Sequence, residues 1–469
     1  MRKSPIVMVA AALVSACTVG PNYQKPMLPS PPTFRAPEGA AVTDATSMGD
    51  LKWWEVFKDE RLQELERTAL EQNYDLRDAA ARIEAASAQL GVTRSSQLPN
   101  AGASADISTI RFSRNGQTPL PAAFIPSQNR TFGGATLSLL SFEVDIWGRL
   151  RRATEAARAR LLSAEENRKA VRTTLVSEVA SSYFTLRELD YQLDISRRTL
   201  GTRQESLGLI KNRQAGGVAT LLDLRQAEQL VYTASETIPV LQQNIEQTEN
   251  RISLLLGRNP GEVLRGRSLT EQDLLPDVPP GLPSALLERR ADIRVAEQNL
   301  IAANAEIGVA KAAYFPQISL SGFLGGQGNQ LSSLFSGPSG VWNFTPQVTQ
   351  PIFTAGRIKS EVRLTQALRD SALIQYEKAI QTAFTEVSDA LIAHQRVRES
   401  RVQQELLVEA LQDRTRLAYV RYRGGVDTLL NALDSDRDLF QAELTLSQIR
   451  LNELNSVVQL YKALGGGWQ

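Results

Sequence analysis

Hydrophobic residues recur every seven positions through a long stretch of the chain that contains no proline. The stretch begins after Gly148 and has few glycines before Gly216, so it has room for one helix of about 65 residues, roughly 100 Å at 1.5 Å per residue. Spacing by seven is typical of coiled-coil packing. We therefore expect a long helix over 148–215. The repeating positions are Leu186, Leu193, Leu200 and Leu207.

The same spacing continues beyond the glycine pair through a shorter stretch. Leu224, Val231 and Ile238 begin this second stripe, which ends near Gly257, just before Pro260. Because a glycine followed closely by a proline is a typical helix stop, we expect a second helix over 220–257, about half as long as the first.

The chain contains this arrangement twice. Landmarks of the first copy recur 208 positions later, and a constant spacing of this kind indicates an internal duplication. We expect repeat 1 over 59–257, a linker over 258–282, repeat 2 over 283–465 with helices over 356–423 and 428–465, and a tail over 466–469. The opening segments 59–98 and 283–314 also have a helical pattern, and we expect each to stack end to end on a short helix. The landmark pairs are Gly148-Arg149 with Gly356-Arg357, Gly216-Gly217-Val218 with Gly424-Gly425-Val426, and Gly257 with Gly465.

Between the opening helix and the long helix, each copy changes to a period of two. Trp342, Phe344 and Val348 alternate with polar residues, and the first copy repeats the pattern around Phe142 and Val144. Such alternation puts one face of a strand against lipid or a core and the other against water. We expect four strands, near 100–110, 131–145, 317–325 and 341–353. A long loop over 111–129 accounts for the extra residues of the first copy.

Four strands are too few to form a closed membrane barrel, and an open sheet edge is not tolerated in hydrocarbon. If the strands lie in a membrane, the chain must therefore associate with copies of itself. Two chains supply eight strands around a filled interior, and three supply twelve, enough for a pore. The pattern alone does not choose between these two assemblies.

The N-terminus has the features of an export signal. Arg2 and Lys3 precede an apolar run that is too short to span a bilayer and that ends in Val14-Ser15-Ala16-Cys17. Cys17 is the only cysteine, so it has no partner for a disulfide and cannot belong to a thiolate zinc site. The pattern predicts a signal peptide over 1–16 and acylation of Cys17, the alternative being a cysteine that merely ends the signal. The proline-rich segment that follows, 17–58, is expected to be extended.

Charge and motifs argue against two classes of function. The chain has 52 basic and 51 acidic residues, without the concentrated basic face that nucleic-acid binding requires. The only histidine, His394, lies in a long-helix pattern, where a packed or solvated residue is commoner than a catalytic base. No phosphate-binding loop, metal-ligand cluster or nucleophile elbow stands out. We expect neither an enzyme nor a cofactor or metal site.

Four segments of the sequence are distinctive. They are Cys17-Thr18-Val19-Gly20-Pro21, Trp53-Trp54 followed by Phe57 and Asp59, Ser141-Phe142-Glu143-Val144-Asp145-Ile146-Trp147-Gly148-Arg149, and Tyr461-Lys462-Ala463-Leu464-Gly465-Gly466-Gly467-Trp468. With these segments the chain resembles the TolC-like outer-membrane efflux channels, and among them the OprM-type lipoprotein branch that serves resistance-nodulation-division pumps. The resemblance covers essentially the whole mature chain. It departs at Ala291, where the family usually has proline.

The resemblance implies an α+β membrane fold: a homotrimer with a twelve-stranded β-barrel in the outer membrane and a twelve-helix tunnel in the periplasm. The implied function is a passive exit duct for drugs and other small toxic compounds, held in the outer membrane by its barrel and its lipid anchor. The implied partners are a periplasmic adaptor protein and an inner-membrane pump. Docking would use the hairpin tips at Gly216-Gly217-Val218 and Gly424-Gly425-Val426.

The resemblance also implies a periplasmic mouth that is closed at rest near these tips. Asp434 falls where the family has a ring of aspartates in the lumen, and Leu430 where OprM-like members have an apolar ring. Asn431 replaces a second aspartate of TolC. Asp223 and Tyr422 fall where TolC-like members link neighbouring helices through a carboxylate and a phenol. For Asp223 a second interpretation has equal weight, because a carboxylate just after a glycine turn stabilises a helix N-terminus.

Two alternatives to small-molecule efflux stay open at this point. A type I protein-secretion duct has the same architecture, although by resemblance its members generally lack the lipidation signal. A lipid-anchored coiled-coil protein without a pore satisfies the spacing by seven equally well. That protein does not explain the duplicated alternation between the helices.

Overall fold

The computed structural model describes residues 18–27, 29, 31, 33–35, 47–111, 129–272 and 283–467. The signal segment 1–16, Cys17 and most of the loop expected over 111–129 lie outside these residues. Contacts between Cα atoms divide the chain into two units. Of the described residues, the sheet unit contains those within 1–27, 83–164 and 296–376, and the hairpin unit contains those within 28–82, 165–295 and 377–469.

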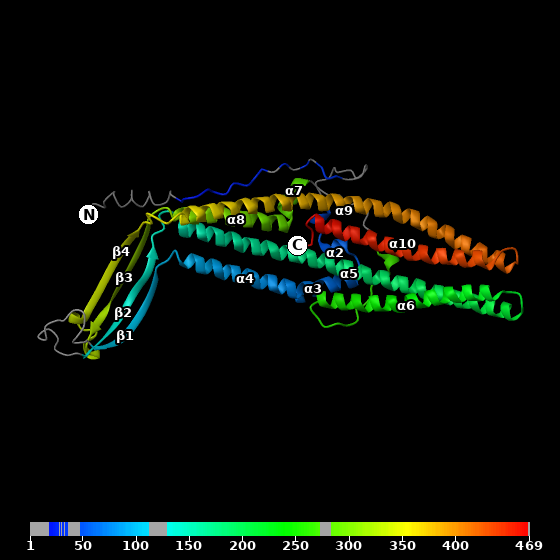
Figure 1. Cartoon of the computed structure of the whole chain (residues 1–469), viewed down its shortest axis with the longest axis horizontal. Helices are drawn as coiled ribbons and strands as arrows, with labels where there is room; N and C mark the ends of the chain where they lie inside the picture. The colour runs from blue at the N-terminus through cyan, green and yellow to red at the C-terminus, as the bar shows by residue number, and fades with distance from the viewer. Residues whose placement is uncertain are drawn as a thin grey trace. The chain divides into compact units, whose positions relative to one another are not determined.

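The sheet unit contains one antiparallel sheet of four strands in the order β1-β2-β3-β4 (Figure 1). The four strands expected from the period of two are therefore present, and β1 and β4 are the edge strands. Two short turns, η4 (Leu331–Ser333) and η5 (Gly337–Ser339), lie between β3 and β4. The strands are β1 (Asn100–Arg111), β2 (Asn129–Glu143), β3 (Gln317–Gly328) and β4 (Gly340–Thr349).

Two long helical hairpins account for most of the helical residues (Figure 1). α5 (Arg149–Ala215) is followed by α6 (Leu221–Leu255), and α9 (Arg357–Arg423) is followed by α10 (Leu429–Ala463). α5 and α9 each have 67 residues, and α6 and α10 each have 35. These equal lengths confirm the internal duplication into long helical hairpins.

Each hairpin reverses direction at its glycine pair. The second glycine of each pair, Gly217 or Gly425, has a φ of +73° or +72°, in the left-handed region that residues with a side chain rarely adopt. The backbone N–H of Val218 then donates to the carbonyl of Arg213 at 2.8 Å, which satisfies one of the last carbonyls of α5. Val426 closes the second turn in the same way.

Each opening helix, expected to be continuous, is divided in two by one residue. Asn73 separates α3 (Glu60–Gln72) from α4 (Tyr74–Ser95), and Arg290 separates α7 (Pro283–Arg289) from α8 (Ala291–Ala312). The Asn73 side-chain oxygen accepts the backbone N–H groups at the start of α4, at 2.8 and 3.1 Å. The side chain thus replaces the backbone partners that a continuous helix would supply.

The two breaks are also the points where the ends of the short helices attach. The Asn73 amide donates to the carbonyl of Leu255, the last residue of α6, at 2.9 Å. In the second repeat Arg290 donates to the carbonyl of Ala463, the last residue of α10, at 3.1 Å. Carbonyls at the ends of both short helices are therefore satisfied by the residue that interrupts the opening helix.

The N-terminal segment is not extended as far as residue 58, contrary to expectation. It contains a 3-10 turn, η1 (Met48–Asp50), and a short helix, α2 (Trp53–Val56). Met48, Trp53 and Phe57 expose only 2, 2 and 4% of their surface, so apolar burial explains why this part of the segment folds. The expected linker likewise contains a 3-10 turn, η3 (Leu269–Glu271), whose Leu269 is buried.

Candidate functional site

The two faces of the sheet have different chemistry. Residues that pair directly across antiparallel strands project to the same face, so the register assigns each side chain to a face. One face is apolar and the other is mainly hydroxyl, amide and glycine. The apolar face includes Ala103, Leu137, Leu320, Leu324, Trp342 and Phe344, and the polar face includes Ser104, Thr136, Ser138, Ser321, Asn343 and Thr345.

The described residues leave the apolar face uncovered at its centre. Leu324 exposes 61% of its surface, Trp342 exposes 80% and Val348 exposes 66%. Because β1 and β4 are edge strands, each also presents a row of unpaired backbone groups. An exposed apolar face beside open edges is unfavourable in water, whereas in hydrocarbon the face is favourable and only the edges need a partner.

The residues next to Cys17 are fixed where β2 leads into α5. The backbone N–H of Val19 donates to the carbonyl of Trp147 at 3.0 Å. Thr18 lies so close to Gly148 that a Cβ on this glycine would overlap it, at 2.5 Å from the methyl carbon. Cys17 itself lies outside the described residues, but its neighbour is thus held at the junction of sheet and helix.

The hairpin tips expose one valine each. Val218 and Val426 follow the glycine pairs Gly216-Gly217 and Gly424-Gly425 and expose 71 and 68% of their surface. The two tips therefore present the same small apolar feature, as the duplication predicts.

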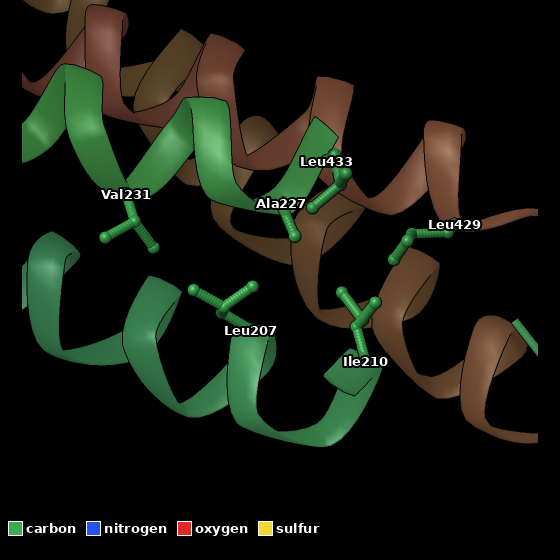
Figure 2. Close-up of a cluster of buried hydrophobic side chains, with 6 residues drawn as sticks. All are labelled: Leu207, Ile210, Ala227, Val231, Leu429 and Leu433. Atoms are coloured by element: carbon green, nitrogen blue, oxygen red, sulfur yellow. The ribbon is translucent and has the colours of Figure 1, made fainter. Parts of the chain in front are cut away.

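Behind the tips, the two hairpins share one hydrophobic cluster (Figure 2). Leu207 and Ile210 from α5 meet Ala227 and Val231 from α6, and Leu429 and Leu433 from α10 complete the group. Ile210 is 1% exposed. The start of α10 is thereby fixed to the first hairpin within a single chain.

Among the described residues, no hydrogen bond joins Asp223 to Tyr422. The Asp223 carboxylate accepts the backbone N–H and the hydroxyl of Thr220, both at 2.8 Å, and closes a capping box at the start of α6. Tyr422 packs against the hydrophobic cluster, with the Arg213 guanidinium 4.9 Å from its ring centre. Within the chain, Asp223 serves as a helix cap, the second of its two interpretations.

Leu430 and Asp434 lie one turn apart near the start of α10. Leu430 is 49% exposed, a large fraction for leucine. The Asp434 side chain is 38% exposed and accepts from Arg437 Nη1 at 3.2 Å. Both side chains are therefore available for contacts outside the chain.

A polar cluster holds the second turn. The Asp427 carboxylate accepts from Arg421 at 3.0 Å and from the Asn431 amide at 2.7 Å. Hydrogen bonds from Arg421, Asn431 and the Thr428 backbone hold the pKa of Asp427 below its usual value. Arg421 thus pairs within its own hairpin.

A buried ion pair lies just behind the cluster, and no sequence pattern indicated it. Arg203 of α5 donates to Asp436 of α10 at 2.7 Å, and the two side chains are only 2 and 9% exposed. Arg203 also donates to the carbonyl of Leu230 and lies over the ring of Phe440. The partners are 233 positions apart, so no local spacing could have revealed them.

The only histidine of the chain joins α9 to α10. His394 is buried, and its Nδ1 hydrogen bonds with Ser456 at 2.9 Å. Within the described ranges, no three or more His, Cys, Asp or Glu side chains are grouped as metal ligands.

None of the described helices has the length and apolar character needed to cross a membrane.

Comparisons with known proteins agree with this geometry. The family model described as outer membrane efflux protein matches residues 65–258 and 282–466. The chain is similar to the toluene efflux pump outer membrane protein TtgF of Pseudomonas putida, with 38% identity over all of this chain and 98% of TtgF. It is similar to the antibiotic efflux pump outer membrane protein ArpC, also of Pseudomonas putida, with 39% identity over 98% of this chain and 94% of ArpC.

Among solved structures, the chain is similar to the open state of the Neisseria gonorrhoeae MtrE outer membrane channel. The TM-score is 0.86 and the identity 32%, over 97% of this chain and 99% of MtrE. The match therefore includes the sheet as well as the helical hairpins. The chain belongs to the outer membrane efflux protein family and is an outer-membrane component of an efflux system.

Proposed function

We propose that three copies of this chain form a passive exit duct for drugs and other small toxic compounds across the outer membrane. The observation that carries the proposal is the two-faced sheet with open edges. Joining β1 of one copy to β4 of the next satisfies both edges, and three copies give twelve strands, enough for a water-filled lumen. The apolar face then meets lipid and the polar face lines the lumen.

The class of compounds exported is proposed from the names of two relatives. TtgF is named for toluene efflux and ArpC for antibiotic efflux, and both are similar to this chain over nearly its full length. A duct of this kind performs no reaction. Its energy comes from an inner-membrane pump of the resistance-nodulation-division type, reached through a periplasmic adaptor.

The adaptor is proposed to dock at the hairpin tips. Val218 and Val426 are exposed apolar side chains on turns that glycine allows and backbone hydrogen bonds close. Equivalent residues on two tips per chain offer six similar contacts around a trimer. Acylation of Cys17 adds the second membrane attachment.

The periplasmic mouth is proposed to narrow at Leu430 and Asp434. Three copies of one aspartate around an axis concentrate negative charge, which favours cations and opposes anions. Leu430 adds an apolar ring one turn away. Asp223 and Tyr422 are proposed to form a contact between neighbouring helices of the assembled trimer.

Single-channel conductance of the detergent-extracted oligomer in planar bilayers tests this proposal. Asp434→Ala and the double change Leu430→Ala with Asp434→Ala are expected to raise conductance and reduce cation preference. Asp413→Ala is the matched control, because Asp413 also pairs with an arginine three positions along its own helix, Arg416 at 2.7 Å, but lies on α9. A folded oligomer that never conducts contradicts the duct and favours the lipoprotein without a pore.

A further inference from the structure

Among the described strand residues, Phe323 is the one aromatic side chain near the middle of the polar face. The strands contain five aromatic residues, Phe132, Phe142, Phe323, Trp342 and Phe344. The register places Phe142, Trp342 and Phe344 on the apolar face. Phe132 and Phe323 project to the polar face, and Phe132 lies near the loop end of β2.

The register around Phe323 is unambiguous. It pairs with Ser138 of β2 on one side and with Asn343 of β4 on the other. Its strand neighbours Gly322 and Leu324 pair with Phe344 and Trp342 and so belong to the apolar face. A one-residue slip would exchange the two faces of β3, but all three strand pairs agree on the assignment.

The ring of Phe323 is not packed away among its neighbours. The nearest residues on the same face are small: Ser321 and Gly325 along β3, with Ser138 and Asn343 across the strands. A Cβ at Gly325 would meet the carbonyl of Ala135, so no side chain can be placed there to cover the ring. Phe323 consequently exposes 40% of its surface.

We propose that Phe323 is a specificity-determining contact for apolar and aromatic compounds in transit through the lumen of the sheet region. The inference rests on the proposed function, since three chains must join for the polar face to enclose a lumen. Twelve strands about 4.8 Å apart and tilted by about 40° form a backbone cylinder of roughly 12 Å radius, so three rings narrow the passage without closing it. Each ring offers a π-face that stacks on a flat apolar solute.

The chemistry of the site suits weak and brief binding. Hydroxyl and amide groups around the ring keep the wall wetted, and Phe323 is the only aromatic side chain at this level of the described strands. A duct needs such weak sites, because tight binding in the lumen would slow release. The solute class is therefore compounds with an exposed ring or alkyl surface.

The first test determines the direction of the side chain. Phe323→Cys and Phe344→Cys are each treated, in the assembled protein in lipid vesicles, with a charged methanethiosulfonate reagent that does not enter hydrocarbon. The wild-type chain, with Cys17 as its only cysteine, gives the background. We expect labelling at position 323 and none above background at position 344; the reverse result overturns the proposal.

The second test measures the contact itself. Benzylammonium and methylammonium share the same charged group and differ in the ring. The dissociation constant for block by methylammonium, divided by that for benzylammonium, therefore measures the contribution of the ring in planar bilayers. Phe323→Ala is expected to reduce this ratio by about two- to tenfold, and Phe323→Leu, which keeps apolar bulk, by less. Phe344→Ala, which removes an equal ring from the apolar face, is expected to leave the ratio unchanged.

The outcomes separate the two proposals. If the wild type conducts and the ratio is the same after Phe323→Ala, the Phe323 contact is wrong while the duct stands. If neither the wild type nor the Leu430→Ala, Asp434→Ala variant passes current, the duct fails and the Phe323 inference fails with it. If the ratio of blocking constants falls in Phe344→Ala and not in Phe323→Ala, the apolar face lines the passage and the proposal is wrong.

Discussion

The buried ion pair between Arg203 and Asp436 gives the sharpest stability prediction. Asp436→Leu removes the carboxylate and leaves the Arg203 guanidinium, 2% exposed, without its charged partner. Its remaining contacts, the Leu230 carbonyl at 3.0 Å and the Phe440 ring, do not neutralise the charge. Breaking a buried pair in this way costs about 3–5 kcal/mol.

The corresponding double variant is expected to recover most of that loss. Arg203→Met combined with Asp436→Leu replaces the pair by apolar side chains of similar size, and such replacements are usually neutral or stabilising. Arg414→Met is the matched control, because Arg414 and Asp438 join α9 to α10 at 3.0 Å but expose 51 and 39% of their side chains. An exposed pair of this kind contributes about 1 kcal/mol or less.

Hydrogen exchange of the detergent-solubilised oligomer measures these differences where they occur. Exchange of amides in α5 near Arg203 and in α10 near Asp436 reports the free energy of local opening. A loss of about 3 kcal/mol accelerates exchange by more than a hundredfold, since each 1.4 kcal/mol is a factor of ten. The reasoning is refuted if Asp436→Leu changes exchange by less than tenfold, or if the double variant exchanges as fast as the single one.

Three further predictions concern other parts of the chain. Glu66 is fully buried, both its carboxyl oxygens lack a hydrogen-bond partner among the described residues, and burial raises its pKa well above the usual value. The contribution of Glu66 to the free energy of unfolding is therefore most favourable below the unfolded pKa of about 4.3, and it is lost as pH rises toward the native pKa. Glu66→Gln, which stays neutral, should stabilise the protein increasingly from pH 5 to 8 in thermal unfolding. Gly266→Ala should cost about 2–4 kcal/mol, because a Cβ there would overlap the Asp59 carboxylate and lie 2.7 Å from the Tyr183 hydroxyl; unfolding in denaturant checks this, and an unchanged midpoint contradicts it. Cys17→Ala should abolish incorporation of labelled palmitate while the oligomer still assembles, and undiminished labelling would place the acyl chain elsewhere.

The contacts of Asp59 explain why a side chain at position 266 is destabilising. Its carboxylate caps α3 through the Arg61 N–H at 2.9 Å and accepts from the Tyr183 hydroxyl at 2.9 Å. Burial acts to raise the pKa of Asp59, but hydrogen bonds from Gln272, Tyr183 and backbone amides outweigh it and the pKa lies below its usual value. One carboxylate thus joins α3, α5 and the segment before η3, and any atom added at Gly266 disturbs all three.

Patterns that persist over many residues made the overall fold predictable. The seven-residue spacing runs through the first hairpin, the second hairpin repeats its landmarks, and the period of two marks strands because each strand face meets one environment. The breaks at Asn73 and Arg290 were not predictable in the same way, since helical periodicity continues through both residues. At each break the interrupting residue hydrogen bonds to the end of another helix, a contact between residues 182 or 173 positions apart.

Some residues of the candidate sites were predictable from local sequence features and others were not. Val218 and Val426 were identifiable because glycine pairs mark turns locally. Asp223 allowed two interpretations because a cap and a link between helices require the same residue type, and only the position of Thr220 distinguishes them within one chain. Arg203 has no local feature that distinguishes it from the many solvated arginines of these helices.

The matched lengths of the hairpins restrict how this chain can evolve. One residue inserted into α5 advances everything beyond it by about 1.5 Å and rotates it by about 100°, which turns Leu207 and Ile210 away from their partners on α6 and α10. A seven-residue insertion leaves Leu207 and Ile210 facing the same direction. Their partners stay level with them only if α6, α9 and α10 lengthen by the same amount. Natural length variation among related chains should therefore fall in the connections between elements, and hairpins that differ in length should differ by sevens, in both repeats together.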